Sequence, residues 1–594
     1  MKKNLRSVFA LFLLALTSNQ CLQAQSVDAR NILNGYSIYD NGYIDQPYAV
    51  VLNNGDWLCV FTTGPGKESQ PGQHIVSTIS SDQGHTWSVP ADIEPSAGPS
   101  ASWAVPYLTP FGRIYVFYDY NGENINTLEG KPIQHNSELG WYCYKYSDDH
   151  GVTWSDRYKL PMPKAPVDFR NDFKGTVQLF WGIDKPKKAG NSMIFSFTRL
   201  GKYVQSDGEG WFYASDNIDQ EKDPGQLRWE LLPAGDTGLR NPAFGSIQEE
   251  FNIAPMNNGD LYCMFRTTMG FAAHAYSHDG AKTWTMPVAA TYSPGGRQIM
   301  KNPRACPRVF KCGNGKYLFW YHNQGEKGYE HRNPVWISGG IEKEGRLYWS
   351  QPEILLYSDD IDVRMSYPDL IEQHGRYWFT ETQKTKARVH AIDPALIEGV
   401  WNQATAKAVI TKGLIAEKHH VRKGQTIFMP PVPGLKDSGF TIALWLKLKD
   451  QAPGQVILDS RDEKGKGIRI ITTDSQALRL EMSDGILPIQ SWDTDPVPLN
   501  DGREHHIVFI ADGAPDIITA VVDGRLCDGG SSRLYGWGRF SAKLEDVNGN
   551  RKLALAPGLH GTISSLRVYN RYLTTSEAIS NFHAGVKAGG RRSY

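Results

Sequence analysis

Four residues of reactive or anion-binding type stand near the ends of strand-like runs: Glu250, Arg266, Arg332 and Tyr367. Two arginines that converge can hold a carboxylate through charge-assisted, bidentate hydrogen bonds. A tyrosine whose proton passes to a glutamate is a chemically sensible nucleophile. These residues can act together only if the fold brings them to one place, so the elements around them decide their meaning.

Three similar turns indicate how those elements are organised. The pattern S-x-D-x-G-x-T-W occurs at Ser80–Trp87 and Ser147–Trp154, and Ser277–Trp284 is a less regular copy whose glycine comes one place early. In such a turn Asp and Gly make the reversal, the hydroxyls fix the turn backbone, and Trp packs beneath it. Repeats at this interval, one per group of short strands, predict a β-propeller.

A repeated strand unit supports the same prediction. Each copy has an apolar strand, a tight turn at a glycine, an aromatic-rich strand and a third strand, and six copies can be read between residues 26 and 405. The turn glycines are Gly55, Gly112, Gly190, Gly259, Gly315 and Gly375. We therefore expect an all-β chain with a six-bladed propeller over 26–405, in which residues 26–45 supply the strand that closes the ring.

The pattern of strands and turns in the sequence changes after residue 403. Phe440–Trp445 reads as an inner strand that ends in Trp, Val522-Asp-Gly524 as a hairpin turn, and Leu566–Thr574 as a closing strand. This order resembles the laminin-G or concanavalin A-like β-sandwich, over residues 418–590. The resemblance concerns the fold, because such domains bind sugars, bind proteins or support a neighbouring domain.

The N-terminal residues predict export. Two lysines and an arginine precede an apolar run from Val8 to Leu16, and Ala24 offers a small-residue cleavage site. This pattern is typical of a signal peptide over 1–24, too short to span a membrane, and predicts a secreted or periplasmic protein. A lipid anchor on Cys21 is the alternative, and Gln20 fits it poorly.

Composition excludes some classes of protein. At 594 residues the chain is expected to have two or more domains, and its net charge of +0 argues against nucleic-acid binding. Six cysteines remain after the leader, and buried thiols are favoured over a disulfide framework, although Cys306 and Cys312 flank a short strand and could pair. No spacing resembles a zinc site, and we expect neither metal nor cofactor.

The repeated turns, the leader and the propeller units together resemble the sialidase superfamily, over residues 40–400. The resemblance implies that Tyr367 is the nucleophile and that Glu250 accepts its proton, with Glu249 as the competing choice. It also implies that Arg266 and Arg332 are two members of the family's arginine triad, which binds the substrate carboxylate. Sialidases with a Tyr nucleophile are an exception to the two-carboxylate rule for glycosidases.

The sequence departs from the family pattern at two points. Asp45 stands where the first arginine of the triad is expected, and the acid/base aspartate is missing from the loop Thr62–His74. Within that loop Glu68 and His74 are the plausible proton carriers. Asp45 could serve if burial raises its pKa, and Asp119 at the end of a strand is a further candidate.

Other strand-end residues could contact a substrate, among them Trp181 and Arg240, with core packing as the alternative for the tryptophan. Three functions follow. The first is an exo-acting, retaining glycoside hydrolase, exo-α-sialidase-like with an atypical site, which acts on terminal sialic acid or another, possibly acidic, sugar. The second is a non-catalytic carbohydrate-binding protein. The third is a lyase acting on uronates, with His74 or Tyr367 as base. The partner is a glycan in each case.

Overall fold

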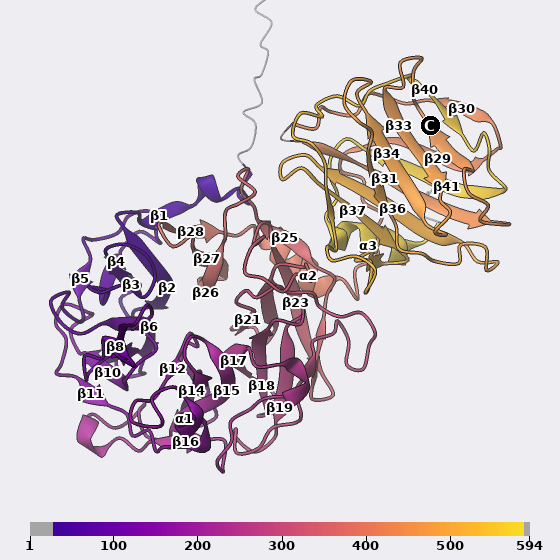
Figure 1. Ribbon diagram of the computed structural model, residues 1–594. Coiled ribbons are helices and arrows are strands. Elements are labelled where there is room, and N and C mark those ends of the chain that lie inside the picture. The colour runs from indigo at the N-terminus through magenta and orange to yellow at the C-terminus, as the bar shows by residue number, and fades with distance from the viewer. Residues whose placement is uncertain (1–27, 437, 587–594) are drawn as a thin grey trace, which may run out of the picture.

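The computed structural model describes residues 28–436 and 438–586, so the predicted leader and Cys21 lie outside the described residues. Within those ranges the chain is almost entirely β-structure and forms two lobes (Figure 1). No helix in the described ranges is long and apolar enough to cross a membrane.

The first lobe consists of antiparallel sheets that follow one another along the chain. Between residues 36 and 391 the described structure contains six sheets of four or five strands. The first three are β2–β5 (Tyr43–Val51, Trp57–Gly64, His74–Ser80, Ala91–Asp92), β6, β7, β10 and β11 (Ala101–Leu108, Ile114–Tyr120, Trp141–Ser147, Tyr158–Lys159), and β12–β16 (Phe180–Trp181, Lys187–Ala189, Ser192–Lys202, Ser206–Ser215, Glu230–Leu232).

The other three sheets complete the lobe. They are β17–β20 (Gln248–Pro255, Leu261–Thr267, Ala273–Ser277, Val288–Ala289), β21–β25 (Arg308–Lys311, Tyr317–Tyr321, Val335–Lys343, Arg346–Trp349, Glu353–Leu356), and β26–β28 (Ser366–Gln373, Arg376–Thr382, Ala387–Ala391) with β1 (Tyr36–Tyr39). Because β1 pairs with β28, the first strand of the lobe belongs to its last sheet. The hairpin β8–β9 (Thr127–Leu128, Lys131–Pro132) and the short helix α1 (Pro166–Arg170) lie in connections.

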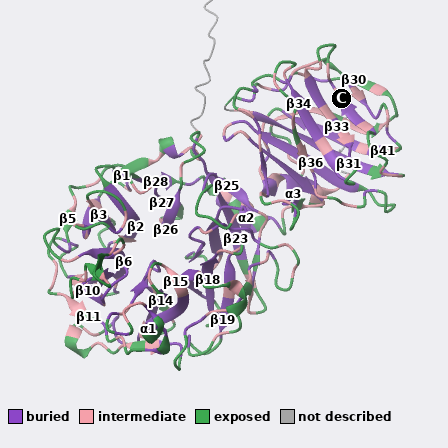
Figure 2. Cartoon of the chain, in the orientation of Figure 1, coloured by how far each residue is buried: buried purple, intermediate pink, exposed green. Residues whose placement is uncertain are grey.

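Aromatic and aliphatic side chains fill the space between successive sheets. The ring centroids of Phe117 in β7 and Phe195 in β14 lie 4.9 Å apart. Those of Trp57 in β3 and Trp378 in β27 lie 5.0 Å apart. The buried positions lie in the strands and the exposed ones mostly in the turns (Figure 2). Figure 1 shows the sheets arranged round a common centre, and the edge strand β2 contacts the edge strands β6 and β26 of the neighbouring sheets.

The three repeated turns share one hydrogen-bond pattern. In the turn Ser147–Trp154, Ser147 Oγ donates to Asp149 and accepts from the Gly151 amide, while Asp149 accepts from the amide and hydroxyl of Thr153. The turn Ser277–Trp284 makes the equivalent bonds although its glycine is displaced. In every copy two consecutive residues are left-handed, Gly280 and Ala281 in this one, so glycine can occupy either position.

The second lobe is a two-layer sandwich. Its first sheet has β29 (Leu414–Val421), β41 (Gly561–Tyr569), β31 (Gly439–Leu448), β36 (His505–Asp512), β37 (Ile517–Val522), β38 (Arg525–Leu526) and β39 (Gly538–Arg539). Its second sheet has β30 (Gln425–Phe428), β40 (Lys552–Leu555), β32 (Val456–Asp459), β33 (Gly467–Thr472), β34 (Leu478–Ser483) and β35 (Gln490–Asp493). One apolar core, with Leu444, Phe509 and Leu480 fully buried, joins the two layers.

Helices and cysteines complete the description. Helix α2 (Pro394–Asn402) packs on β23 and against α3 (Thr575–Ala584), which begins with the hydroxyl of Thr574 as its N-cap. All six described cysteines are buried free thiols, as favoured from the sequence, so Cys306 and Cys312 do not pair.

Candidate active site

Four of the edge strands contain a β-bulge near their start. The pairing register shifts in β2 between Asp45 and Tyr48, and in the same way in β6, β17 and β26. One residue within each bulge has a left-handed backbone: Gln46 (φ 53°), Trp103 (φ 58°), Glu250 (φ 56°) and Tyr367 (φ 47°). Bulges change the direction of a side chain, and left-handed non-glycine residues concentrate at functional sites.

Two of these bulge residues are in direct contact. The Tyr367 hydroxyl donates to Glu250 Oε1 over 2.9 Å, and both side chains are buried. Burial, together with the charge of Glu250, raises the pKa of Tyr367 well above its usual value, so its hydroxyl stays protonated. Burial also raises the pKa of Glu250, against the effect of Arg266. The phenol therefore has a carboxylate placed to receive its proton.

Arg266 connects the two neighbouring glutamates of β17. Its Nη1 lies 2.5 Å from Glu250 Oε1 and its Nη2 lies 2.9 Å from Glu249 Oε1. Arg304 also contacts Glu249 Oε1, at 2.9 Å. Glu249 is thus held by two arginines, whereas Glu250 faces Tyr367. This geometry separates the two glutamates that the sequence left in competition.

Arg332 lies beside this pair. Its Nη1 donates to the hydroxyl of Ser366, the residue before Tyr367, and its Nη2 donates to the Arg304 carbonyl over 2.9 Å. Its Nε is buried and has no protein partner. The charges of Tyr367, Arg266 and Glu250 all act on the pKa of Arg332, which burial lowers from its usual value. Glu250, Arg266, Arg332 and Tyr367 therefore converge.

Asp45 is joined to a lysine that the sequence analysis did not single out. Lys384 Nζ lies 2.6 Å from Asp45 Oδ2 and 3.1 Å from Glu68 Oε2, and 4.6 Å from the ring centroid of Tyr367. Burial raises the pKa of Asp45, while Lys384 acts against that rise. The pKa of Glu68 lies below its usual value. Burial acts to raise it, but the charge and hydrogen bond of Lys384 act to lower it. Of the two proton carriers in the 62–74 loop, Glu68 is the one at the site.

His74 and Arg240 have their contacts elsewhere. The His74 ring lies against Asp92 and the Gly72 carbonyl, at 3.4 and 3.2 Å. Arg240 pairs with Asp207 at 2.7 Å, in a group of charges beside the sheet β12–β16. The Tyr–Glu–Arg cluster thus forms without either of them.

Asp119 and Trp181 lie in the interior. Both carboxylate oxygens of Asp119 are buried without a partner, and Ser102 stands opposite it in the ladder. Burial, with the nearby charge of Glu138, raises the pKa of Asp119 well above its usual value. Burial raises the pKa of Glu138 to about 8. The ring of Trp181 lies 5.3 Å from the Arg266 guanidinium, which places this tryptophan beneath the arginine.

Sequence reasoning missed Lys384, Glu138 and Arg304. Lys384 lies in the turn between β27 and β28, and Glu138 lies in the irregular segment before β10. Arg304 precedes β21, also outside any repeated unit. None of the three belongs to a recurring motif, so the sequence carried no positional signal for them.

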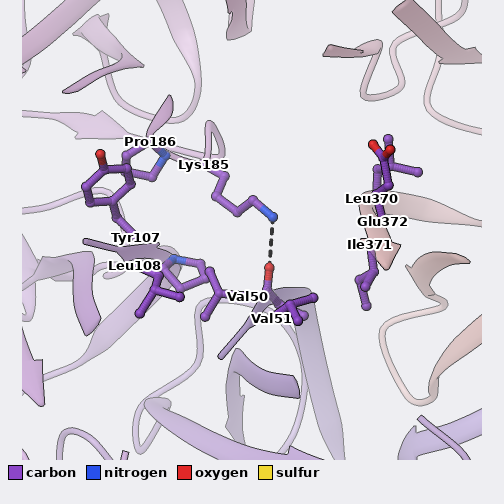
Figure 3. A pocket seen from close by; sticks show the side chains of 11 residues that line it. Val50, Val51, Tyr107, Leu108, Lys185, Pro186, Leu370, Ile371 and Glu372 are labelled. Carbon is purple, nitrogen blue, oxygen red and sulfur yellow. Dashed lines mark hydrogen bonds between the residues drawn. The ribbon is translucent and has the colours of Figure 1, made fainter. Parts of the chain in front are cut away.

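A separate pocket of about 290 Å³ lies at the opposite ends of the same strands (Figure 3). It is lined by Val50 and Val51 of β2, Leu108 of β6 and Ile371 of β26, all of which follow the bulges along the chain. Lys185 extends into it but is already bonded to the Ala49 carbonyl and to Asp369, at 2.8 and 2.7 Å. The reactive groups therefore gather at one end of the sheets and not at this one.

Comparison with known proteins identifies the second lobe. Residues 422–578 match the family model described as the concanavalin A-like lectin/glucanases superfamily. The C-terminal lobe is a concanavalin A-like domain. This confirms the resemblance drawn from the strand order of the sequence.

The chain also has a sequence relative among known proteins. Part of the chain is 26% identical over 186 residues to the anhydrosialidase of Macrobdella decora, an alignment that covers 28% of this chain and 21% of the relative. The match thus spans about a fifth of that protein. It agrees with the sialidase-like fold that the repeated turns indicated.

Solved structures give the same type of neighbour. Trypanosoma rangeli sialidase aligns over 92% of this chain and 94% of its own, with 13% identity and a TM-score of 0.43. A leech intramolecular trans-sialidase complexed with 2,7-anhydro-Neu5Ac aligns over 61% of this chain and 71% of its own, with 15% identity and a TM-score of 0.44.

Proposed function

We propose that this protein is an exported, exo-acting, retaining glycoside hydrolase that releases a terminal sugar acid, such as sialic acid, from a glycan. The observation that carries the proposal is the buried hydrogen bond from the Tyr367 hydroxyl to Glu250, with Arg266 and Arg332 beside it. In this proposal the six sheets are the blades of a propeller, and the bulged strands place the site near its centre.

The Tyr–Glu pair suits a substrate with a carboxylate next to the reacting carbon. Such a carboxylate repels an anionic nucleophile, whereas Tyr367 is neutral until its proton passes to Glu250. The tyrosyl oxygen then bonds to the anomeric carbon as the bond to the leaving oxygen breaks. Water later attacks the same carbon and frees the tyrosine, which retains the configuration of the sugar.

The cations at the site would bind the acid group of the sugar. Arg332 has an unpartnered buried Nε, and its Nη2 bonds only a backbone carbonyl. Arg266 already balances Glu249 and Glu250, so Arg332 supplies the more available positive charge. Lys384 balances Asp45, which removes the repulsion that a lone Asp45 would exert on an anionic sugar.

Glu68 is the proton carrier that the contacts favour for the leaving group. Its side chain is 33% exposed, it contacts Lys384, and Lys384 lies over the ring of Tyr367. A partly exposed carboxyl at the open side of a buried nucleophile can reach both the leaving oxygen and solvent.

A sialic-acid-binding or other carbohydrate-binding protein is the second candidate. The observation that favours it is the same Lys384 contact, because it lowers the pKa of Glu68 and so weakens that residue as a general acid. A binder would use Arg332 and Arg266 in the same way but would release no product.

The test is turnover of aryl glycosides of sialic acid, of uronic acids and of neutral sugars, each followed by aryl release. We expect turnover of an acidic sugar, a first product that retains the anomeric configuration by NMR, and a loss of about a thousandfold or more in Tyr367→Phe. Tyr348→Phe, at a partly exposed position on β24, is the matched control and should keep full activity.

Two results would contradict the hydrolase. Calorimetric binding of the sugar acid without turnover would establish the carbohydrate-binding alternative. A rise in absorbance from unsaturated uronate, produced from a polysaccharide, would instead show a lyase.

A further inference from the structure

A loop of the concanavalin A-like domain contacts the loop that carries Arg332. The first loop lies between β38 and β39 and contains residues 527–537, and the second joins β22 to β23 and contains residues 322–334. Gln324 of one loop pairs with Tyr535 of the other, although about 200 residues separate them in the sequence.

Their backbones meet at one isolated antiparallel bridge. Gln324 and Tyr535 form an isolated antiparallel bridge, the Gly325 amide donates to the Leu534 carbonyl over 2.8 Å, and the Gly536 amide donates to the Asn323 carbonyl over 3.3 Å. These backbone hydrogen bonds join the two loops directly, so the domain holds this part of the loop.

Side chains extend the contact towards the arginine. The Tyr535 hydroxyl donates to Glu326 Oε1 over 2.5 Å, and its ring meets the His331 ring edge-on at 6.4 Å. Gln324 Nε2 donates to the His331 carbonyl over 3.2 Å. Tyr535 therefore touches both ends of the segment 326–331, and the next residue is Arg332.

The same loop also positions Arg304. The Arg304 amide donates to the Gly328 carbonyl over 2.8 Å, and Arg332 Nη2 donates to the Arg304 carbonyl over 2.9 Å. A hydrogen-bonded path thus leads from Tyr535 through residues 326–332 to the arginines that face Glu249 and Ser366.

Lysine and arginine contacts secure the two loops at their outer ends. Lys301 Nζ donates to the carbonyls of Asp528 and Arg533, at 2.5 Å each, and Arg539 Nη2 donates to the Asn333 carbonyl over 3.4 Å. The contacts of Lys301 and Arg539 therefore help to fix the 527–537 loop next to the loop 322–334.

We propose that the concanavalin A-like domain completes the active site, with Tyr535 as a positioning residue that holds the loop 323–333 and, through it, Arg332. The domain thus acts on recognition of the anionic sugar without touching it. The hydrogen bond to Glu326 and the backbone bridge both oppose local opening of this loop.

The first experiment does not depend on any activity. Hydrogen exchange of the full-length protein is compared between the wild type, Tyr535→Phe and the control Tyr569→Phe, which loses a hydroxyl bond to Ile410 in the same domain. We expect peptides covering 323–333 to exchange about tenfold faster in Tyr535→Phe only. Unchanged exchange in this segment would overturn the proposal.

The second experiment rests on the proposed function. With the acidic aryl glycoside, Tyr535→Phe should raise KM about five- to tenfold and change kcat little, because it loosens a binding residue and leaves the Tyr367–Glu250 pair intact. Glu326→Gln keeps an acceptor for the Tyr535 hydroxyl and should retain most of the wild-type KM. A fall in kcat at constant KM would contradict the positioning role.

The two experiments separate failure of the function from failure of the inference. If no glycoside is turned over, the exchange result still decides whether Tyr535 holds the loop. If turnover is present but only overall stability falls, with equal exchange changes throughout the concanavalin A-like domain, the domain has a structural role alone and the proposal is wrong.

Discussion

The acidic side chains of the site differ in charge because their surroundings differ. Glu249 is held by two arginines and Glu68 by Lys384, whereas Glu138 accepts a hydrogen bond from the Gln205 amide. Burial raises the pKa of Glu138 to about 8, whereas Lys384 brings that of Glu68 below its usual value. Carboxyl groups whose pKa values are pushed apart in this way can take different roles.

Glu138→Gln should stabilise the protein at neutral and alkaline pH. The folded state keeps the Glu138 proton up to about pH 8, while the unfolded state loses it near 4.5. Its stabilising effect is complete below pH 4.5 and is lost as the pH rises through about 8, at about 1.4 kcal/mol per unit as an upper limit. Thermal unfolding of variant and wild type should therefore diverge from pH 5 to 8.

The ionisation of Glu138 depends on its buried, charged surroundings, so an exposed glutamate serves as the control. Burial, Glu249 and Glu68 oppose its ionisation, and Arg304 favours it. Glu463→Gln, at an exposed position on the other lobe, should give a difference that does not vary with pH. A Glu138→Gln difference that is equally flat would show that Glu138 ionises normally.

At the scale of elements, the repeated turns stabilise the outer edges of the sheets. Asp149 accepts from Ser147, from the Thr153 amide and from the Thr153 hydroxyl. Asp149→Ala removes these exposed hydrogen bonds and should lower the free energy of unfolding by about 1–2 kcal/mol. Urea unfolding measures this loss of free energy. The control is Asp156→Ala, at an exposed position just beyond the same turn, which should leave the free energy of unfolding almost unchanged. Equal losses in both variants would contradict a specific role for the turn.

The sequence predicted the elements better than the site. Repeated turns and glycine hairpins are local patterns, so the sheets around Gly55, Gly112 and Gly259 could be read directly. The bulges could not, because a register shift depends on the partner strand as well as on Asp45 or Tyr367. The resemblance to sialidases named Tyr367 and Glu250 correctly as neighbours, but the charge beside Asp45 comes from Lys384, in a turn that no pattern marks.

At the scale of the whole molecule, a glutamate of one lobe caps a helix of the other. Glu353 of β25 accepts from the amides of Thr575 and Ser576, at 3.0 and 2.7 Å, and from the Ser576 hydroxyl at 2.7 Å. These are the first residues of α3, where unpaired amides and the helix dipole favour a negative group. The junction is therefore part of the start of the helix.

Glu353→Ala should weaken the contact between the lobes. It leaves two buried amides without an acceptor, which costs about 1–3 kcal/mol. We expect the wild type to unfold in one calorimetric transition, and the transition of Glu353→Ala to broaden or split, with the concanavalin A-like domain unfolding first. Glu353→Gln keeps one acceptor oxygen and should lose less than half as much. An unchanged transition in Glu353→Ala would show that the cap does not couple the lobes.

The four β-bulges have a consequence for how this protein can change. A bulge residue stands outside the pairing register, so the side chains of Gln46, Trp103, Glu250 and Tyr367 have no directly opposite partner in the ladder. The left-handed backbone disfavours β-branched replacements and favours Asn, Asp or His. Libraries limited to these four positions should therefore change the chemistry of the site without shifting the strand register, and natural variation could use the same route to new substrates.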